Sequence, residues 1–192
     1  SPVIGEDTAD TGADEHTGDA DTARELFPVA MRQVEYALSL LDEKGIVTFP
    51  EWGWTHFIDW APRLEYTTPC HGILLYALER MANLAQALGE TEKAEKWTAD
   101  LEKGRIAARK HLFSEEKGCF RNDYDKDLYM VHAQVWMILG GVVSGEEGKT
   151  ILRNAFTVAM VLGVIVNGAM LYEYLTKTGH LAAHYLRFAK IF

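Results

Sequence analysis

The stretch "HGILLYALERMANLAQALGETEKAEKWTADLEKGRIAARKHLF" (residues 71–113) contains two helical patterns in succession, separated by a glycine. Apolar residues in its first half recur every three or four positions, which predicts an amphipathic helix that begins near residues 68–70. This stripe consists of Leu74, Leu75, Leu78, Met81, Ala82, Ala85 and Leu88. Gly89 follows it and is a common helix stop. A second stripe contains Ala94, Trp97, Leu101, Ile106 and Leu112, with charged residues on the other side. The stretch therefore predicts a helical hairpin.

The same periodicity extends to both sides of this hairpin. "DTARELFPVAMRQVEYALSLLDEKG" (21–45) predicts a helix capped by Asp21 or Thr22 and stopped at Gly45. Shorter helices are predicted downstream, in residues 128–143, 145–156 and 169–192. Residues 114–127 are predicted to be a turn-rich connector, and no strand-like alternation competes with the helical pattern.

We therefore predict an all-α chain of about six or seven helices. Helix pairs joined by short turns are compatible with an α/α toroid, a tetratricopeptide-like solenoid or a bundle. The solenoid is disfavoured because no period of roughly 34 residues recurs along the chain.

Length and charge narrow the classes of function. A chain of 192 residues fits one domain or a piece of a larger one. A net charge of −9 argues against nucleic acid as a partner, because binding to phosphates normally requires a basic face. Residues 1–20 are rich in Gly, Thr, Asp and Ala and have little to bury, so we expect a mobile acidic lead-in there.

The sequence also lacks the signals of membrane insertion and secretion. The most apolar run, residues 155–171, is interrupted by polar residues and glycine and is shorter than the roughly 20 residues that span a bilayer. We interpret it as buried core. The beginning of the chain does not resemble a signal peptide, so a cytoplasmic location is expected.

Neither a metal site nor a disulfide is indicated. Cys70 and Cys119 lie in different predicted segments without metal-ligand spacing, and we expect them to be buried or half-buried free thiols. His180 and His184 have helical i, i+4 spacing but no third ligand nearby. No cofactor is expected.

Five stretches, taken in order, resemble the catalytic domain of bacterial α-L-rhamnosidase-like glycoside hydrolases. They are "HTGDADTARELFPVAMRQVEYALSLLDEKGIV", "WTHFIDWAP", "LLYALERMANLAQALGETEKAEKW", "HLFSEEKGCF" and "VHAQVWMILGGVV". The resemblance covers residues 17–156. It implies an (α/α)6 toroid of helical hairpins in which six inner helices surround a sugar-binding funnel.

The resemblance also implies a reaction. Such enzymes hydrolyse terminal α-L-rhamnosides with inversion, using a general acid and a general base whose carboxyl groups lie roughly 6.5 to 9.5 Å apart. The usual acid lies upstream of "HTGD" and the usual base lies downstream of the last helices, and this chain contains neither segment. We therefore expect residues 21–192 to be a partial barrel, a fragment or truncated product that is inactive alone, with its catalytic residues unassigned. The implied partner is a rhamnoside, and oligomers are possible.

"PEWGWTHFIDWAP" (50–62) is the main candidate for sugar contact, because aromatic faces stack on sugar rings and a carboxylate accepts hydrogen bonds from their hydroxyls. The candidates in and beside it are Trp52, Trp54, His56, Asp59, Trp60 and Glu65. The alternative is that Asp59 caps a helix or turn, that the tryptophans fill the barrel wall and that Glu65 is solvated.

Two further candidates lie in "VHAQVW". His132 and Trp136 are four residues apart and share a helix face, whereas Gln134 points away from both. The alternative is core packing for Trp136 and capping for His132. His71 begins a predicted helix, where a hydrogen-bonded histidine of the cap region is the expected role.

Two other functions stay open at this point. The chain could be a non-catalytic helical-repeat interaction domain, or a sugar epimerase or lyase on the same toroid, because a fold does not determine its chemistry.

Overall fold

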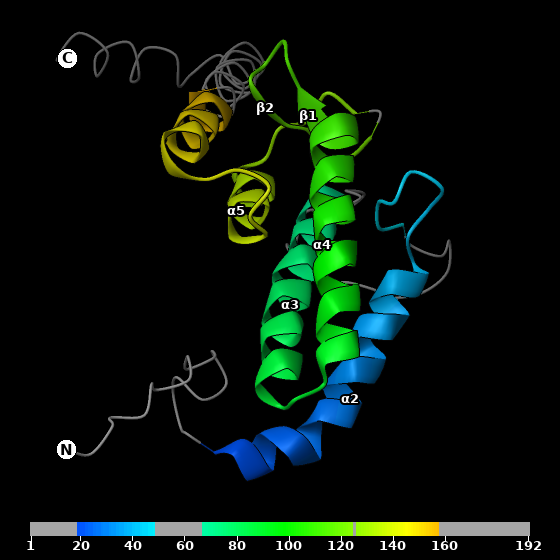
Figure 1. Cartoon of the computed structure of the whole chain (residues 1–192). Coiled ribbons are helices and arrows are strands. Elements are labelled where there is room, and N and C mark those ends of the chain that lie inside the picture. The colour runs from blue at the N-terminus through cyan, green and yellow to red at the C-terminus, as the bar shows by residue number, and fades with distance from the viewer. Residues whose placement is uncertain (1–18, 49–66, 125, 158–192) are drawn as a thin grey trace, which may run out of the picture.

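The computed structural model describes residues 19–48, 67–124 and 126–157 of the chain. These residues form mainly helices (Figure 1). The helices are α2 (Ala20–Ser39), α3 (Thr67–Ala87), α4 (Thr91–Leu112) and α5 (Val131–Leu139), and residues 145–157 are helical as well. The predicted helical class is confirmed, whereas closure into a toroid stays a prediction. The predicted lead-in and the 169–192 helix lie outside the described residues.

Helices α3 and α4 form the predicted antiparallel hairpin (Figure 1). Gly89 adopts a left-handed conformation with φ of 80°. The Gly89 amide donates to the Gln86 carbonyl, and the Glu90 amide donates to the Ala85 carbonyl. These two bonds are the Schellman arrangement that closes a helix end, so the predicted stop at Gly89 is confirmed.

One hydrophobic core lies between α2, α3 and α4. The predicted stripe of α3 is buried there apart from Leu88, which is partly buried. Trp97 of α4 is 1% exposed and meets the Phe27 ring of α2 edge to face, with centroids 6.0 Å apart. Aromatic pairs prefer this geometry. The contact anchors α2 to the α3–α4 helical hairpin.

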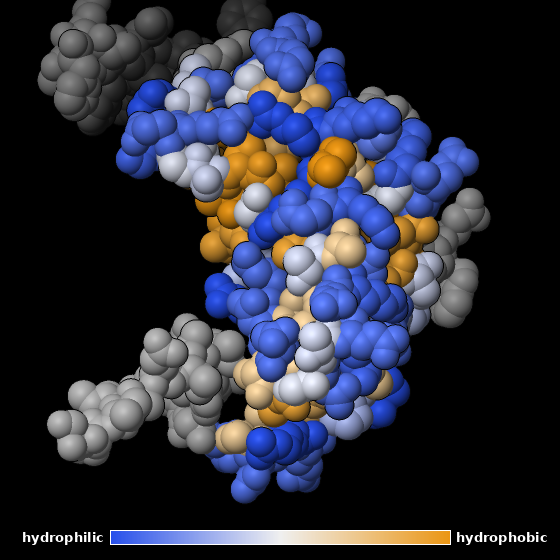
Figure 2. All heavy atoms as spheres, viewed as in Figure 1, coloured by the Kyte–Doolittle hydropathy of each residue, from blue (hydrophilic) through white to orange (hydrophobic). Residues whose placement is uncertain are grey.

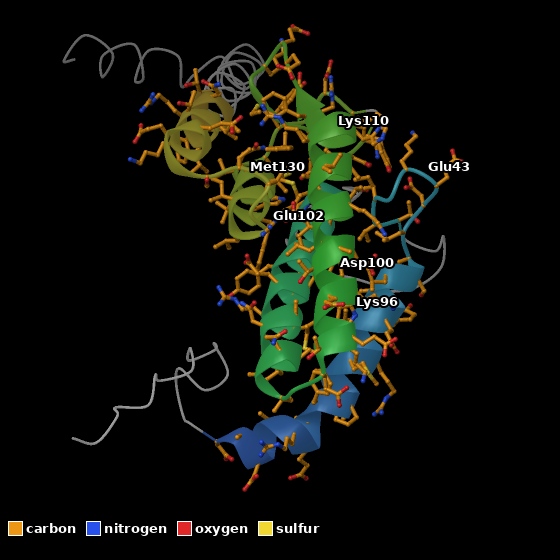
Figure 3. The ribbon with its side chains drawn as sticks, in the orientation of Figure 1. Glu43, Lys96, Asp100, Glu102, Lys110 and Met130 are labelled. Atoms are coloured by element: carbon orange, nitrogen blue, oxygen red, sulfur yellow. The ribbon has the colours of Figure 1, made fainter. Side chains whose placement is uncertain are left out.

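The predicted stripe of α4 is wrong at one position. Ile106 is 66% exposed, while Gly104 and Ala108 are buried. A helix advances 100° per residue, so residues 97, 101, 104 and 108 share one face and residue 106 lies on the opposite side. Lys96, Glu102 and Lys110 occupy the exposed side of α4 (Figure 3), as the charge pattern predicts.

Helix α2 begins and ends at different residues from those expected. Its cap is Asp19, whose carboxylate accepts from the Thr22 amide at 3.0 Å and from the Thr22 hydroxyl at 2.6 Å. Its last residue is Ser39, well before Gly45. The Asp42 carboxylate accepts from the amides of Lys44 and Ile46, both at 2.9 Å, and thereby closes a turn that replaces the last helical turn.

The predicted connector contains a small antiparallel hairpin, so the expectation of no strands is wrong. Strand β1 (Phe113–Ser114) pairs with β2 (Cys119–Phe120), with Phe113 opposite Phe120. Gly118 turns the chain with φ of 60°. Two-residue strands are too short to produce a visible alternation in sequence.

A second core joins the β1–β2 hairpin to α5 and residues 145–157. It includes Ile46, Leu112, Phe120, Met137 and Ile151. Helices α3 and α5 approach so closely that a Cβ on Gly72 would lie 2.7 Å from the Trp136 carbonyl group. Arg105 of α4 donates from Nε to the Gly140 carbonyl at 2.9 Å, just past the end of α5.

Two further expectations can be compared with the described residues. Cys70 is half-buried and Cys119 is buried, and both are free thiols, as predicted. Burial raises the pKa of Cys70 to about 12, which keeps this thiol protonated and unreactive. Within the described ranges, the helices are too short or too polar to cross a bilayer.

Candidate functional site

Buried polar side chains gather at one end of the described fold. They come from the start of α3, the hairpin and the residues after it, and the start of α5, and they are Thr67, Thr68, His71, Ser114, Asn122, Asp123 and Gln134. The turn formed by residues 40–48 lies at the same end (Figure 1). Residues 49–66 connect this turn to α3, so the main predicted sugar-contact stretch attaches here.

His71 occupies the centre of this end and is fully buried. Its Nε2 lies 3.0 Å from the Gly104 carbonyl oxygen of α4, and its Nδ1 accepts from the Val47 amide at 3.4 Å. Burial lowers the pKa of His71 below its ordinary value of 6.5, although the Gly104 carbonyl and the Asp42 charge act in the opposite direction. The expectation that His71 is hydrogen-bonded is confirmed, but its partners are Val47 and Gly104 of other segments, so it does not cap the start of α3.

Asp42 ties the same turn to the segment after the hairpin. Its Oδ2 accepts from the Tyr124 hydroxyl at 2.5 Å, and the Lys44 ammonium lies 4.5 Å from the centre of the Tyr124 ring. Burial by itself would raise the pKa of Asp42, but the Tyr124 hydroxyl, the two turn amides and the Lys44 charge outweigh it and lower that pKa. Asp42 is therefore ionised at neutral pH and acts as an anchor of the turn.

The start of α3 is held by residues 121 and 122. The Thr68 hydroxyl donates to the Arg121 carbonyl at 2.6 Å, and the Thr68 amide donates to the Asn122 carbonyl at 3.1 Å. Helix starts have unpaired amides, and these contacts satisfy one of them. Both flanks of residues 49–66 are thus fixed in the fold.

Gln134 contacts the β1–β2 hairpin through both the oxygen and the nitrogen of its carboxamide. Oε1 accepts from the Phe120 amide at 2.8 Å, and Nε2 donates to the Phe120 carbonyl at 2.7 Å and the Met130 carbonyl at 3.1 Å. The side chain therefore pairs with β2 as a neighbouring strand would. Gln134 faces the hairpin while Trp136 contacts α3, as the helical spacing predicts.

Of the eight predicted sugar-contact residues, two lie in the described ranges. His132 is half-buried, with its Nε2 shielded from solvent. Trp136 is half-buried and packs edge to face on Tyr76 of α3, with centroids 6.4 Å apart. This contact supports the packing alternative for Trp136. The remaining predicted residues, Trp52, Trp54, His56, Asp59, Trp60 and Glu65, lie outside the described residues.

The sequence reasoning did not single out Asn122 and Asp123, which are 1% and 5% exposed. The Asp123 carboxylate accepts from the Tyr124 amide at 2.7 Å and lies 3.5 Å from the Lys126 ammonium. Their stretch, "RNDYD", mixes polar and aromatic residues as residues 50–62 do, and that similarity was the available signal. Carboxylates, amides and aromatic rings are the groups that bind polyhydroxy ligands. Within the described ranges, no cluster of three or more possible metal ligands occurs.

Comparison with solved structures links this fold to known enzymes. A rhamnosidase from Klebsiella oxytoca with rhamnose bound superimposes on 75% of this chain with a TM-score of 0.69 and 31% sequence identity. The chain is similar to part of a rhamnosidase. This finding confirms the resemblance inferred from the sequence, and the matched share of the Klebsiella rhamnosidase is 28%.

A second rhamnosidase gives a consistent result. The GH78 family rhamnosidase of Bacillus sp. GL1 matches 72% of this chain and 15% of its own, with a TM-score of 0.63 and 26% identity. No protein-family model matches the chain, and no curated protein matches it either. The chain thus spans less than a third of each of these two rhamnosidases.

Proposed function

We propose that this chain is part of a rhamnoside hydrolase and supplies one wall of its sugar site. The observation that carries the proposal is the 31% identity over 75% of the chain to a rhamnosidase whose structure holds rhamnose. In the full-length parent, the reaction is hydrolysis of a terminal α-L-rhamnoside by an inverting pair of carboxylates. Those carboxylates lie in other parts of the parent, so this chain alone binds sugar without hydrolysing it.

The geometry of the buried polar end supports this function. Residues 49–66 follow Thr48 and precede Thr67, and both flanks are anchored through α3, the Asp42 turn and residues 121–124. A stretch with three tryptophans and three carboxylates is thereby attached at both ends to the described fold. Fixed attachment points favour sugar binding, because they reduce the conformational freedom that is lost when the ligand binds.

A helical interaction module is the second candidate. Leu26, Val29 and Tyr36 of α2 are 56%, 47% and 58% exposed. Apolar surface also gathers over α5 (Figure 2), where Val135 and Leu139 are 38% and 45% exposed. Exposed apolar patches commonly mark surfaces that another protein or another part of the same protein covers.

Tryptophan fluorescence of the chain titrated with L-rhamnose tests the first function. We expect a saturable change with L-rhamnose that Trp60→Phe and Asp59→Asn each weaken by about tenfold, as for the loss of one good contact. Trp97→Phe is the matched control, because Trp97 is buried against Phe27 in the α2–α3–α4 core, and this variant should keep the affinity.

Two results would contradict the proposal in different ways. No response to L-rhamnose at tens of millimolar would remove the sugar-wall function and favour the interaction module. Hydrolysis of an aryl α-L-rhamnoside by the chain alone would show that its catalytic carboxylates lie inside the chain.

A further inference from the structure

His71 is bonded on both ring nitrogens by backbone groups of two other segments. The Val47 amide can only donate a hydrogen bond, so Nδ1 must be an unprotonated acceptor. The Gly104 carbonyl can only accept, so Nε2 must carry the hydrogen. The two partners therefore specify a neutral imidazole in the Nε2–H tautomer.

The turn that His71 holds is already formed within itself. Asp42 accepts from the amides of Lys44 and Ile46, and the Thr48 amide donates to the Leu40 carbonyl at 2.8 Å. Two polar contacts then join this closed turn to distant segments: Val47 with His71, and Asp42 with Tyr124. The buried side chains of Ile46 and Val47 also hold the turn, so it separates from α3 as one body only when the loss of these polar contacts outweighs that apolar burial.

Helix α4 comes close to His71 because its residue 104 is a glycine. A Cβ on Gly104 would lie 2.6 Å from the Leu75 side chain and 3.6 Å from His71 Nε2. The absence of a side chain therefore lets α4 approach α3 near the imidazole. His71 thus lies where α3, α4 and the 40–48 turn meet.

We infer that His71 is a positioning residue whose neutral imidazole holds the 40–48 turn on α3 and α4, and whose protonation releases that turn. An imidazolium would present an Nδ1–H to the Val47 N–H, so two donors would face each other in a buried place. The inference deepens the proposed function and rests on it in one respect: the turn leads directly into residues 49–66, so its release would also weaken sugar binding.

The charged groups around the ring fit a release in mildly acidic solution. Asp42 acts on the ring from the turn. The group of α4 that faces the His71 ring is the Gly104 carbonyl. The two charged neighbours of Gly104 are directed elsewhere. Arg105 is bonded to the Gly140 carbonyl and to Glu79 and Glu102, and the Lys103 side chain is 77% exposed. From α3 itself, the neighbouring Cys70 thiol is uncharged.

The sign of the pH dependence follows from the lowered pKa of His71. In the released state the ring is in water and takes up a proton below about pH 6.5, whereas the bound ring resists protonation. The contact is therefore fully effective above that pH and weakens as the pH falls. Asp42 acts in a lower range, because its pKa lies below 3.8 in the fold.

Nuclear magnetic resonance of the full chain tests the inference without sugar. Imidazole nitrogen shifts should show the Nε2–H tautomer of His71 at neutral pH. The hydrogen-exchange protection of the Val47 amide should be lower than that of Ala108 in α4, and should fall progressively as the pH decreases below about 6.5. His71→Asn retains a possible acceptor but does not titrate, so it should abolish this slope at Val47.

Tyr124→Phe is the matched control, because it removes the other contact of the turn and leaves His71 in place. It should lower Val47 protection while keeping the slope. An Nδ1–H tautomer, a flat Val47 profile in the unmodified chain, equal protection of Val47 and Ala108, or a slope that persists in His71→Asn would each overturn the inference. The expected exchange behaviour without any response to L-rhamnose would leave it standing and refute only the proposed sugar wall.

Discussion

The carboxamide of Gln134 shows how much one side chain contributes to this fold. It is fully buried and satisfies both backbone groups of Phe120. Gln134→Met keeps a similar volume but leaves a buried amide and a buried carbonyl unpaired. Because such a loss is worth about 1 to 3 kcal/mol per group, we expect the free energy of unfolding to fall by about 2 to 6 kcal/mol.

Urea denaturation measures this change, and Gln86→Met provides the control. Gln86 is an exposed glutamine of α3, so its replacement should change the free energy of unfolding by less than about 0.5 kcal/mol. Equal effects of the two substitutions would mean that the Gln134 contacts contribute nothing specific.

At the residue scale, sequence reasoning succeeds where the partner is local and fails where it is distant. Gly89 is recognisable because the two bonds that stop α3 involve its immediate neighbours. The partners of His71 are backbone groups 24 and 33 residues away, and those of Thr68 are 53 and 54 residues away. Backbone groups carry no residue-type signal, so neither role was visible before the fold was known.

At the scale of the element, the first turn of α2 depends on Asp19. The Thr22 hydroxyl and amide lower the pKa of this carboxyl below 3.8. Asp19→Ala should therefore raise the exchange rate of the Thr22 amide roughly fivefold, as for the loss of a typical N-cap. The cap is fully formed above the ordinary pKa of Asp, and its contribution is lost as the pH falls through the lowered value.

Hydrogen exchange at neutral pH checks this expectation, with Asp21→Ala as the control. Asp21 is exposed and forms only a surface pair with Arg24, so its removal should leave the Thr22 amide nearly unchanged. If Asp21→Ala had the larger effect, the cap would be at Asp21, which is one of the two caps expected from the sequence.

The elements themselves were predictable in proportion to their length. Helices α3 and α4 extend over 21 and 22 residues, so their periodicity is clear and their limits were close to those expected. The end of α2 was misjudged because the Asp42 side chain captures amides that a helix would use. The two-residue strands β1 and β2 left no periodic signal.

At the scale of the whole molecule, α2 is attached along one edge through Phe27. This ring is 7% exposed and contacts Trp97, whereas its neighbour Leu26 is 56% exposed. Phe27→Ala should lower the free energy of unfolding by about 3 kcal/mol or more, because it leaves a cavity in the core. Leu26→Ala should lower it by less than about 1 kcal/mol.

Thermal or urea unfolding followed by circular dichroism measures both variants. A similar loss for the two substitutions would mean that the outer face of α2 is covered, by another copy of the chain or by residues beyond the described ranges. The pair of variants therefore also tests the interaction-module candidate.

The resemblance to rhamnosidases was the most predictable property of the whole molecule, because the order of five stretches was more specific than any one of them. The similarity to two solved rhamnosidases confirms this resemblance. The position of the candidate site was predictable only in part. Residues 50–62 were identified by composition, but the polar frame around their attachment, including Asn122 and Asp123, is assembled from segments far apart in sequence.

The short connection through Gly89 also has a consequence for the order in which the chain folds. Helices α3 and α4 meet across three residues, so their pairing closes a small loop and loses little chain entropy. The 40–48 turn must wait until that pair exists, because His71 of α3 and Gly104 of α4 together form its docking place. Damage within the helical pair should therefore slow refolding, whereas damage at the turn should mainly accelerate unfolding.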